Sequence, residues 1–144
     1  MNKKSGFTLL ELLIVLGIMT ILFMLGLASY PSTQKKARDS ARIADLNNIR
    51  ASLEIYRSNN SFYPIDWETL ETEKYLESIP TDPYSPRQDY IYKRIPTNCN
   101  NSAILCNDFT LGAKLEIIPT NACYLTLNCG NSSCNYCVGP YGTK

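Results

Sequence analysis

An apolar run near the N-terminus is followed by an amphipathic pattern. Between Leu12 and Ala28 the only polar side chain is Thr20, and a helix of this length would cover ~26 Å, close to the thickness of the hydrocarbon core of a bilayer. Phe7 and Tyr30 flank the run. We therefore predict a helix over 7–30 that crosses a membrane.

Beyond this run, apolar residues recur at intervals of three and four, which is the spacing of one helix face. The apolar positions are Ile43, Leu46, Ile49, Leu53 and Tyr56, and the charged positions between them are Arg42, Asp45, Arg50, Glu54 and Arg57. The pattern predicts an amphipathic helix over 31–60 whose apolar stripe packs on a globular domain. Because Pro31 lacks an N–H, it should kink the long helix without having to end it.

The rest of the chain, 61–144, has the patterns of a short helix, strands and turns. Asp66 can cap a helix that extends to about Leu76, and the alternation over Tyr90–Ile95 is typical of a strand. Further strands are predicted at Phe109–Ile118 and Cys123–Asn128, separated by the turn signal Pro119-Thr120-Asn121. We expect an α+β fold in which the long helix packs on an antiparallel sheet of about three strands, followed by a cysteine-rich tail.

Composition argues against two function classes. The chain has no histidine, the commonest general base near neutral pH and the commonest metal ligand, so we do not predict an enzyme. The 14 Lys and Arg and 13 Asp and Glu residues are scattered along the chain, and no basic stripe is available to follow a phosphate backbone. Nucleic acid is therefore not a predicted partner.

All six cysteines lie between Cys99 and Cys137. Such a density is typical of a small exported domain closed by disulfides, so we expect this part of the chain in an oxidising compartment. Cys99 and Cys106 bracket one short polar loop and are a candidate local pair. The sequence does not choose among the pairings of the other four, which are Cys123, Cys129, Cys134 and Cys137.

Zinc binding or thiol chemistry is an alternative use of these cysteines. Four thiolates are a common structural zinc set, and Cys134-Asn-Tyr-Cys137 has a suitable spacing. A second such pair is missing from the sequence, and a reactive thiol is usually activated at a helix N-terminus, whereas no helical pattern follows Cys134. We therefore predict disulfides and no metal or other cofactor. The alternative is a membrane-anchored extracytoplasmic module that does not polymerise and serves in binding, thiol chemistry or metal binding.

The charges around the apolar run predict its orientation. Lys3 and Lys4 precede the run and no comparable charge directly follows Tyr30, which places the N-terminus in the cytoplasm and the cysteines outside. A secretory leader is an alternative, because Gly26-Leu27-Ala28 has the small-x-small form that signal peptidase accepts. The mature chain would then begin at Ser29.

Glu11 is a carboxylate inside the apolar run. A charge at mid-membrane costs roughly 2.5–3.5 kcal/mol, so a specific cationic partner is expected unless the side chain snorkels to headgroup water. The surrounding Ser5-Gly6-Phe7-Thr8-Leu9-Leu10-Glu11 resembles the processing motif of the type IV pilin and type II secretion pseudopilin superfamily. The resemblance implies that a prepilin peptidase cuts between Gly6 and Phe7 and methylates the Phe7 amine, and that Glu11 meets the Phe7 ammonium of a neighbouring subunit.

The same resemblance implies a segment plan and a function. Residues 1–6 would be a leader, 7–30 a transmembrane and filament-core helix, 31–60 its amphipathic half, and 61–144 an extracytoplasmic pilin domain. The protein would be a structural subunit of a type IV pilus or type II secretion-like pseudopilus. Its implied partners are other pilin subunits, the peptidase, an inner-membrane platform and a cytoplasmic assembly ATPase. Its implied location is the inner membrane before assembly and an extracytoplasmic or cell-surface filament after assembly.

The type of filament is left open by the C-terminal part. The stretch from Arg50 to Pro64 and the Asp82-Pro83 loop look like those of major pseudopilins, which commonly hold calcium through C-terminal acidic residues. Here Glu116 is the last acid, and the Asn, Ser and Gly that follow are weak calcium ligands. Three Asn-x-Ser triplets, at Asn59, Asn100 and Asn131, are weak signals for glycosylation.

Overall fold

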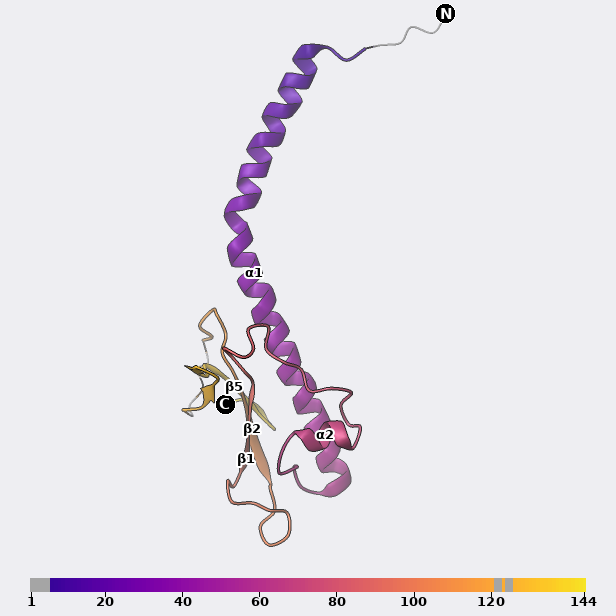
Figure 1. Cartoon of the computed structure of the whole chain (residues 1–144), viewed down its shortest axis with the longest axis vertical. Helices are drawn as coiled ribbons and strands as arrows, with labels where there is room; N and C mark the ends of the chain where they lie inside the picture. The colour runs from indigo at the N-terminus through magenta and orange to yellow at the C-terminus, as the bar shows by residue number, and fades with distance from the viewer. Residues whose placement is uncertain (1–5, 121–122, 124–125) are drawn as a thin grey trace, which may run out of the picture. The chain divides into compact units, whose positions relative to one another are not determined.

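The computed structural model describes residues 6–120, 123 and 126–144, and within its long helix it describes the side chains other than those at 25 and 27–29. The chain divides into two compact units, Met1–Lys35 and Lys36–Lys144. One helix, α1 (Leu9–Asn60), runs through both (Figure 1). It continues past Pro31, since a proline inside a helix removes one backbone hydrogen bond and the turns on either side can remain.

The N-terminal unit is the first part of α1. Its large apolar side chains from Leu9 to Met24 are exposed, from 50% at Val15 to 82% at Leu9. Within the described part of the chain, no helix combines the length and the apolar character needed to cross a membrane.

The second unit, the globular unit, holds a four-stranded antiparallel sheet instead of the predicted three strands. Its order is β1 (Ile91–Ile95), β2 (Asp108–Ala113), β5 (Tyr136–Gly139) and β6 (Gly142–Thr143). A separate hairpin pairs β3 (Asn128–Cys129) with β4 (Ser132–Ser133). The sheet lies beside the C-terminal part of α1, and the short helix α2 (Glu68–Thr72) lies near the end of α1 (Figure 1).

The core of the globular unit confirms the predicted packing of the amphipathic helix. Four of the five predicted stripe residues, Leu46, Ile49, Leu53 and Tyr56, are at most 6% exposed and pack with β2 in one cluster, whereas Ile43 is half-buried. A buried side chain of this size contributes about 1.5–3 kcal/mol relative to an exposed one. Helix and sheet therefore hold each other, as the three- and four-residue spacing predicted.

Two predicted strands were wrong in extent. The strand expected at Phe109–Ile118 ends at Ala113, because side chains take over the backbone groups that follow: Asn135 Oδ1 accepts from the Leu115 N–H at 2.6 Å, and the Asp39 carboxylate accepts from the next two N–H groups at 2.9 Å each. Of the strand expected at Cys123–Asn128, Asn128 is in β3, the described residues 123, 126 and 127 are in no strand, and 124–125 lie outside the described residues.

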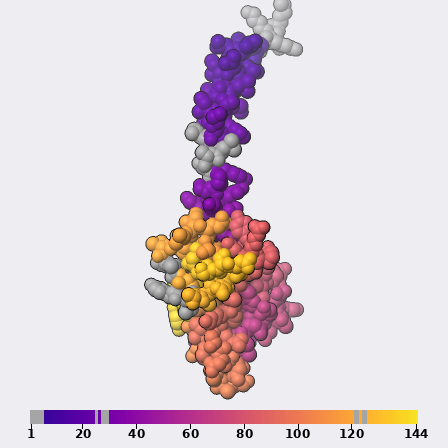
Figure 2. Space-filling model, turned by 60° about the vertical axis from the view of Figure 1, so that its left-hand side comes forward, coloured from indigo at the N-terminus to yellow at the C-terminus, as the bar shows by residue number. Residues whose placement is uncertain are grey.

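Three disulfides close the C-terminal part of the globular unit. They are Cys99–Cys106, Cys123–Cys137 and Cys129–Cys134. Figure 2 shows the C-terminal residues, in yellow, gathered on one face of this unit beside the orange residues that precede them. The tail predicted as cysteine-rich is thus also where the third and fourth strands of the sheet, β5 and β6, are formed.

Candidate assembly site

The first turn of α1 is closed by a reciprocal pair of side chains. The Thr8 backbone N–H and hydroxyl both donate to Glu11 Oε2, at 3.0 and 2.8 Å. In return, the Glu11 N–H donates to Thr8 Oγ1 at 3.2 Å. This is a capping box, which satisfies two backbone donors that a helix N-terminus otherwise leaves free. It fixes the position of the Glu11 carboxylate at the start of the apolar helix.

Thr8 was not singled out from the sequence, although a signal for it exists. A Thr followed three residues later by Glu, directly before an apolar run, is the sequence pattern of a capping box. The resemblance to a processing motif predicted roles for Gly6, Phe7 and Glu11 but none for Thr8. The structure brings Thr8 and Glu11 together within the same chain.

Gly6 and Phe7 lie just before α1 in the exposed segment that leads into it. The Phe7 side chain is 86% exposed, and a Cβ added at Gly6 would meet no atom within 4 Å. The bond between them is therefore sterically accessible, directly upstream of a capped helix start.

The globular unit contains a second cluster, built around the fully buried Arg42. Its Nε and Nη2 donate to the two Asp82 oxygens at 2.7 and 3.1 Å, and its Nη1 donates to Asp39 Oδ1 at 2.8 Å. Burial by itself would lower the pKa of Arg42, but the hydrogen bonds to Asp82 and Asp39 outweigh it and hold the pKa above its ordinary value. The guanidinium therefore stays charged inside the domain.

Glu116 joins this cluster to a second arginine. Arg38 Nε and Nη2 donate to the two Glu116 oxygens at 2.6 and 2.9 Å, and Arg42 Nη1 reaches Oε1 at 3.3 Å. The Arg38 hydrogen bonds hold the pKa of Glu116 below its ordinary value, against the opposing effect of burial. The Tyr84 ring lies 5.1 and 5.3 Å from the two guanidinium carbons, within the range of cation–π attraction.

Arg42 was predicted on the polar side of the helix, and this prediction was wrong. Asp39 and Arg42 are 5% and 0% exposed, and their spacing to Leu46 and Ile49 continues the buried stripe upstream by three, four and three residues. The sequence did contain a signal for the burial of Arg42, because this residue has the same helical spacing as the apolar stripe. Its charge alone had been interpreted as a sign of exposure.

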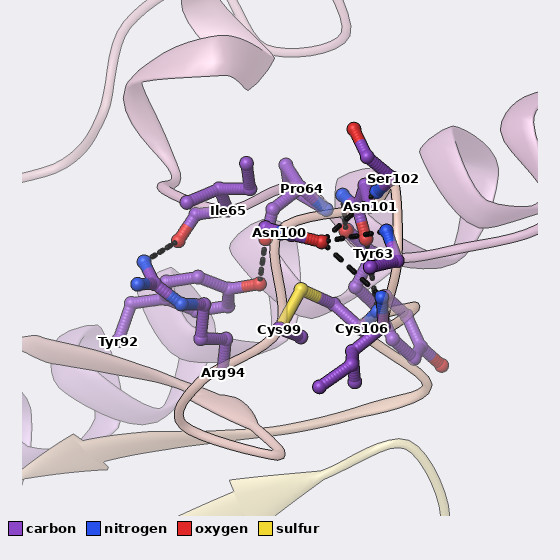
Figure 3. Close-up of a disulfide and its surroundings, with 12 residues drawn as sticks. Tyr63, Pro64, Ile65, Tyr92, Arg94, Cys99, Asn100, Asn101, Ser102 and Cys106 are labelled. Atoms are coloured by element: carbon purple, nitrogen blue, oxygen red, sulfur yellow. Dashed lines mark hydrogen bonds between the residues drawn. A yellow bond between two sulfur atoms is a disulfide. The ribbon is translucent and has the colours of Figure 1, made fainter.

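The Cys99–Cys106 disulfide closes a loop whose backbone is held by two asparagines (Figure 3). Asn100 Oδ1 accepts from the N–H groups of the three residues 102–104 at 2.9 to 3.2 Å. Asn101 accepts from the Cys106 N–H at 2.9 Å and donates to the Tyr63 carbonyl at 2.8 Å. The loop is thereby tied to the chain that leaves α1.

The remaining cysteines bear on the zinc and thiol alternative. The four considered for zinc are bonded as Cys123–Cys137 and Cys129–Cys134, so their sulfurs are not thiolates able to bind a metal. Among the described residues, no cluster of His, Cys, Asp and Glu has an arrangement that could hold a metal ion. The observed pairing therefore gives the metal module no support.

A processed-type N-terminal motif, one long apolar-to-amphipathic helix and a small disulfide-closed α+β domain define the class of pilin-like filament subunits. The family described as "Prokaryotic N-terminal methylation motif" matches residues 1–27. The chain belongs to the family of the type II secretion system core protein G, the major pseudopilins.

Three curated relatives carry this family name. The protein from Klebsiella michiganensis is 33% identical over 66% of this chain and 67% of its own length, and that from Klebsiella pneumoniae is 31% identical over 67% and 69%. The Vibrio cholerae protein is 31% identical over 67% of this chain and 65% of its own length, so the match spans slightly less than two thirds of that relative. No solved structure matches the chain significantly.

Proposed function

We propose that this protein is a structural subunit of a type II secretion pseudopilus. In this proposal a prepilin peptidase cuts the chain between Gly6 and Phe7 and methylates the Phe7 amine. Support comes from the match of residues 1–27 to the methylation motif and from the family of core protein G relatives. The accessible Gly6–Phe7 bond is consistent with this processing.

The observation that carries the proposal is the exposed apolar surface of α1. Large apolar side chains between Leu9 and Met24 are at least half exposed, and each would gain about 1.5–3 kcal/mol on full burial. Lipid offers that burial before assembly, and neighbouring copies of the same helix offer it in a filament. We therefore propose that the run anchors the subunit in the inner membrane, with Lys3 and Lys4 on the cytoplasmic side.

Glu11 would set the register of the packed helices. In the single chain the Glu11 carboxylate accepts hydrogen bonds from Thr8, which keep it at the helix start. Thr8 directly follows Phe7, the residue that would become the N-terminus after cutting. In the filament, the Phe7 ammonium of a neighbour would neutralise it, since a carboxylate buried among apolar helices needs a cation. An inner-membrane platform and its ATPase would supply the energy for extraction. The protein itself would catalyse no reaction.

Replacement of Glu11 tests this role. We expect Glu11→Ala to be inserted and cut normally but to yield few filaments, or filaments with altered register, because the charge pair is lost. Sheared filaments from the outer surface, counted by immunoblot and electron microscopy, give the measurement. Glu77→Ala, the same change at an exposed residue of the globular unit, should assemble normally. Wild-type filament yield and symmetry from Glu11→Ala would remove the assigned role.

A further inference from the structure

The C-terminal part of the chain has few carboxylates, and each is already paired. After Asp89 the acidic residues are Asp108 and Glu116. Both Asp108 oxygens accept from Lys144 Nζ at 2.8 Å, and both Glu116 oxygens accept from Arg38. A calcium ion, which the resemblance to major pseudopilins implies, needs six to eight oxygen ligands at 2.3–2.6 Å. The residues present here do not fit that requirement.

The Arg42 guanidinium lies where three segments of the chain each contribute one carboxylate. Arg42 contacts Asp39 from the same helix, Asp82 from the loop before β1 and Glu116 from the segment after β2. These segments are far apart in sequence, so one buried cation joins three parts of the globular unit. The Asp39 carboxylate also accepts two backbone N–H groups from the segment after β2. The segment that carries Glu116 is thus held to α1 by side chains of the protein itself.

Disulfides hold the segment that follows. Cys123 is bonded to Cys137 in β5, and Cys129 is bonded to Cys134 across the β3–β4 hairpin. Each bridge restricts the unfolded chain and so favours the folded state. The ion pairs of Glu116 and the two disulfides that follow it in the sequence together hold the C-terminal part of the globular unit.

We infer that this pseudopilin folds and assembles without calcium, with the Arg42 guanidinium serving as the resident cation of the globular unit. The internal pairs of Arg38 and Lys144 occupy the remaining C-terminal carboxylates. The inference about folding stands apart from the proposed function, whereas the inference about assembly rests on it.

The direct test compares thermal unfolding of the full chain, purified in detergent, with millimolar CaCl₂ and with excess EGTA. The midpoint is expected to agree within about 1 °C in the two conditions. A bound ion present at about 100 times its dissociation constant would raise the midpoint by several degrees. A fall of that size on adding EGTA would overturn the inference.

The role of Arg42 needs its own variant. Arg42→Met keeps most of the side-chain volume but leaves buried Asp39 and Asp82 without their cation, and the midpoint should fall by roughly 10 °C or more. Arg87→Met makes the same change at an exposed arginine and should shift it by less than about 2 °C. An Arg42→Met midpoint equal to that of Arg87→Met would refute the assigned role.

Two further measurements keep the test decisive if Arg42→Met does not fold. Arg38→Met removes the outer partner of Glu116 and should lower the midpoint more than Arg87→Met does, whereas an equal shift would contradict the ionic tie. Filament yield in calcium-depleted medium should match that in calcium-containing medium. Absence of filaments in both media would count against the proposed function alone, since the unfolding midpoints still decide the question of calcium.

Discussion

At the scale of single residues, the same charge type serves two different purposes in this chain. Glu11 is exposed at the start of an apolar helix and is held there by Thr8, whereas Glu116 is mostly buried between Arg38 and Arg42. The structure shows no cation paired with the first carboxylate among the described residues, and we propose that its cation comes from a neighbouring subunit. The second already has its cations, and its contribution is to the folded subunit.

Processing should depend on the small residue before the cut. We expect Gly6→Val to leave an uncut precursor without N-methylation, because the β-branched side chain occupies space that a peptidase accepting glycine would require. Gly17→Val, a matched change in the apolar part of α1 where an added Cβ also meets nothing within 4 Å, should still be cut. The N-terminus is read by fragmentation mass spectrometry. Efficient cutting of Gly6→Val after residue 6 would show that the requirement is wrong.

Acid should weaken the globular unit in part through Glu116. Its pKa is below the ordinary value of 4.5 when folded, so its ionised form contributes stability above about pH 4.5. That contribution is lost as the pH falls from there through the folded pKa. Unfolding midpoints measured from about pH 7 to pH 3 should fall less steeply for Glu116→Gln than for wild type. Parallel curves for the two proteins would mean that Glu116 makes no such contribution.

At the scale of elements, the periodicity of apolar residues predicted the helix face that packs on the sheet but did not predict the last two strands of the sheet. The stripe from Leu46 to Tyr56 was predictable because its apolar residues recur at helical spacing and pack against the sheet. Strands β5 and β6 were not, because they contain four and two residues of Tyr, Cys, Val, Gly and Thr with no clear alternation. The place of β5 in the sheet depends on pairing with β2 and on the Cys123–Cys137 bond, and β6 pairs in turn with β5.

The candidate assembly site was predictable to a similar extent. Gly6, Phe7 and Glu11 were predicted from the motif. The contact between Thr8 and Glu11 was not predicted, because the motif implies a partner for Glu11 in another subunit. The Arg42 cluster could not be assembled from sequence, since Asp82 and Glu116 are 40 and 74 positions away from it. The sequence alone indicates only that Arg42 has the same helical spacing as the apolar stripe.

The β3–β4 hairpin should be sensitive to a single methyl group at its turn. Gly130 has φ +69°, and an added Cβ would lie 2.7 Å from the Arg87 carbonyl oxygen. Gly130→Ala should therefore destabilise the globular unit by about 1–3 kcal/mol in chemical denaturation. Gly17→Ala, in an open helical position, should not reduce the stability of that unit. An unchanged denaturation midpoint for Gly130→Ala would contradict the described turn.

At the scale of the whole molecule, the two units differ in which surfaces and contacts they contain. The N-terminal unit holds the proposed cutting site, the Glu11 carboxylate bound by Thr8, and an apolar helix surface with no covering side chains among the described residues of this unit. The globular unit is closed internally by a buried ionic cluster and three disulfides. We therefore propose that the first unit forms the contacts between subunits and that the second unit folds without calcium.

The most direct test of the central claim is the intact mass of the protein from native membranes or sheared filaments, with fragmentation to read its N-terminus. We expect a chain that begins at N-methylated Phe7 and gains two hydrogens per disulfide on reduction. A chain that begins at Ser29 would identify the apolar run as a secretory leader, and a chain that still begins at Met1 would show that no prepilin peptidase processes it. Either result would contradict the assignment of this protein as a processed pseudopilus subunit.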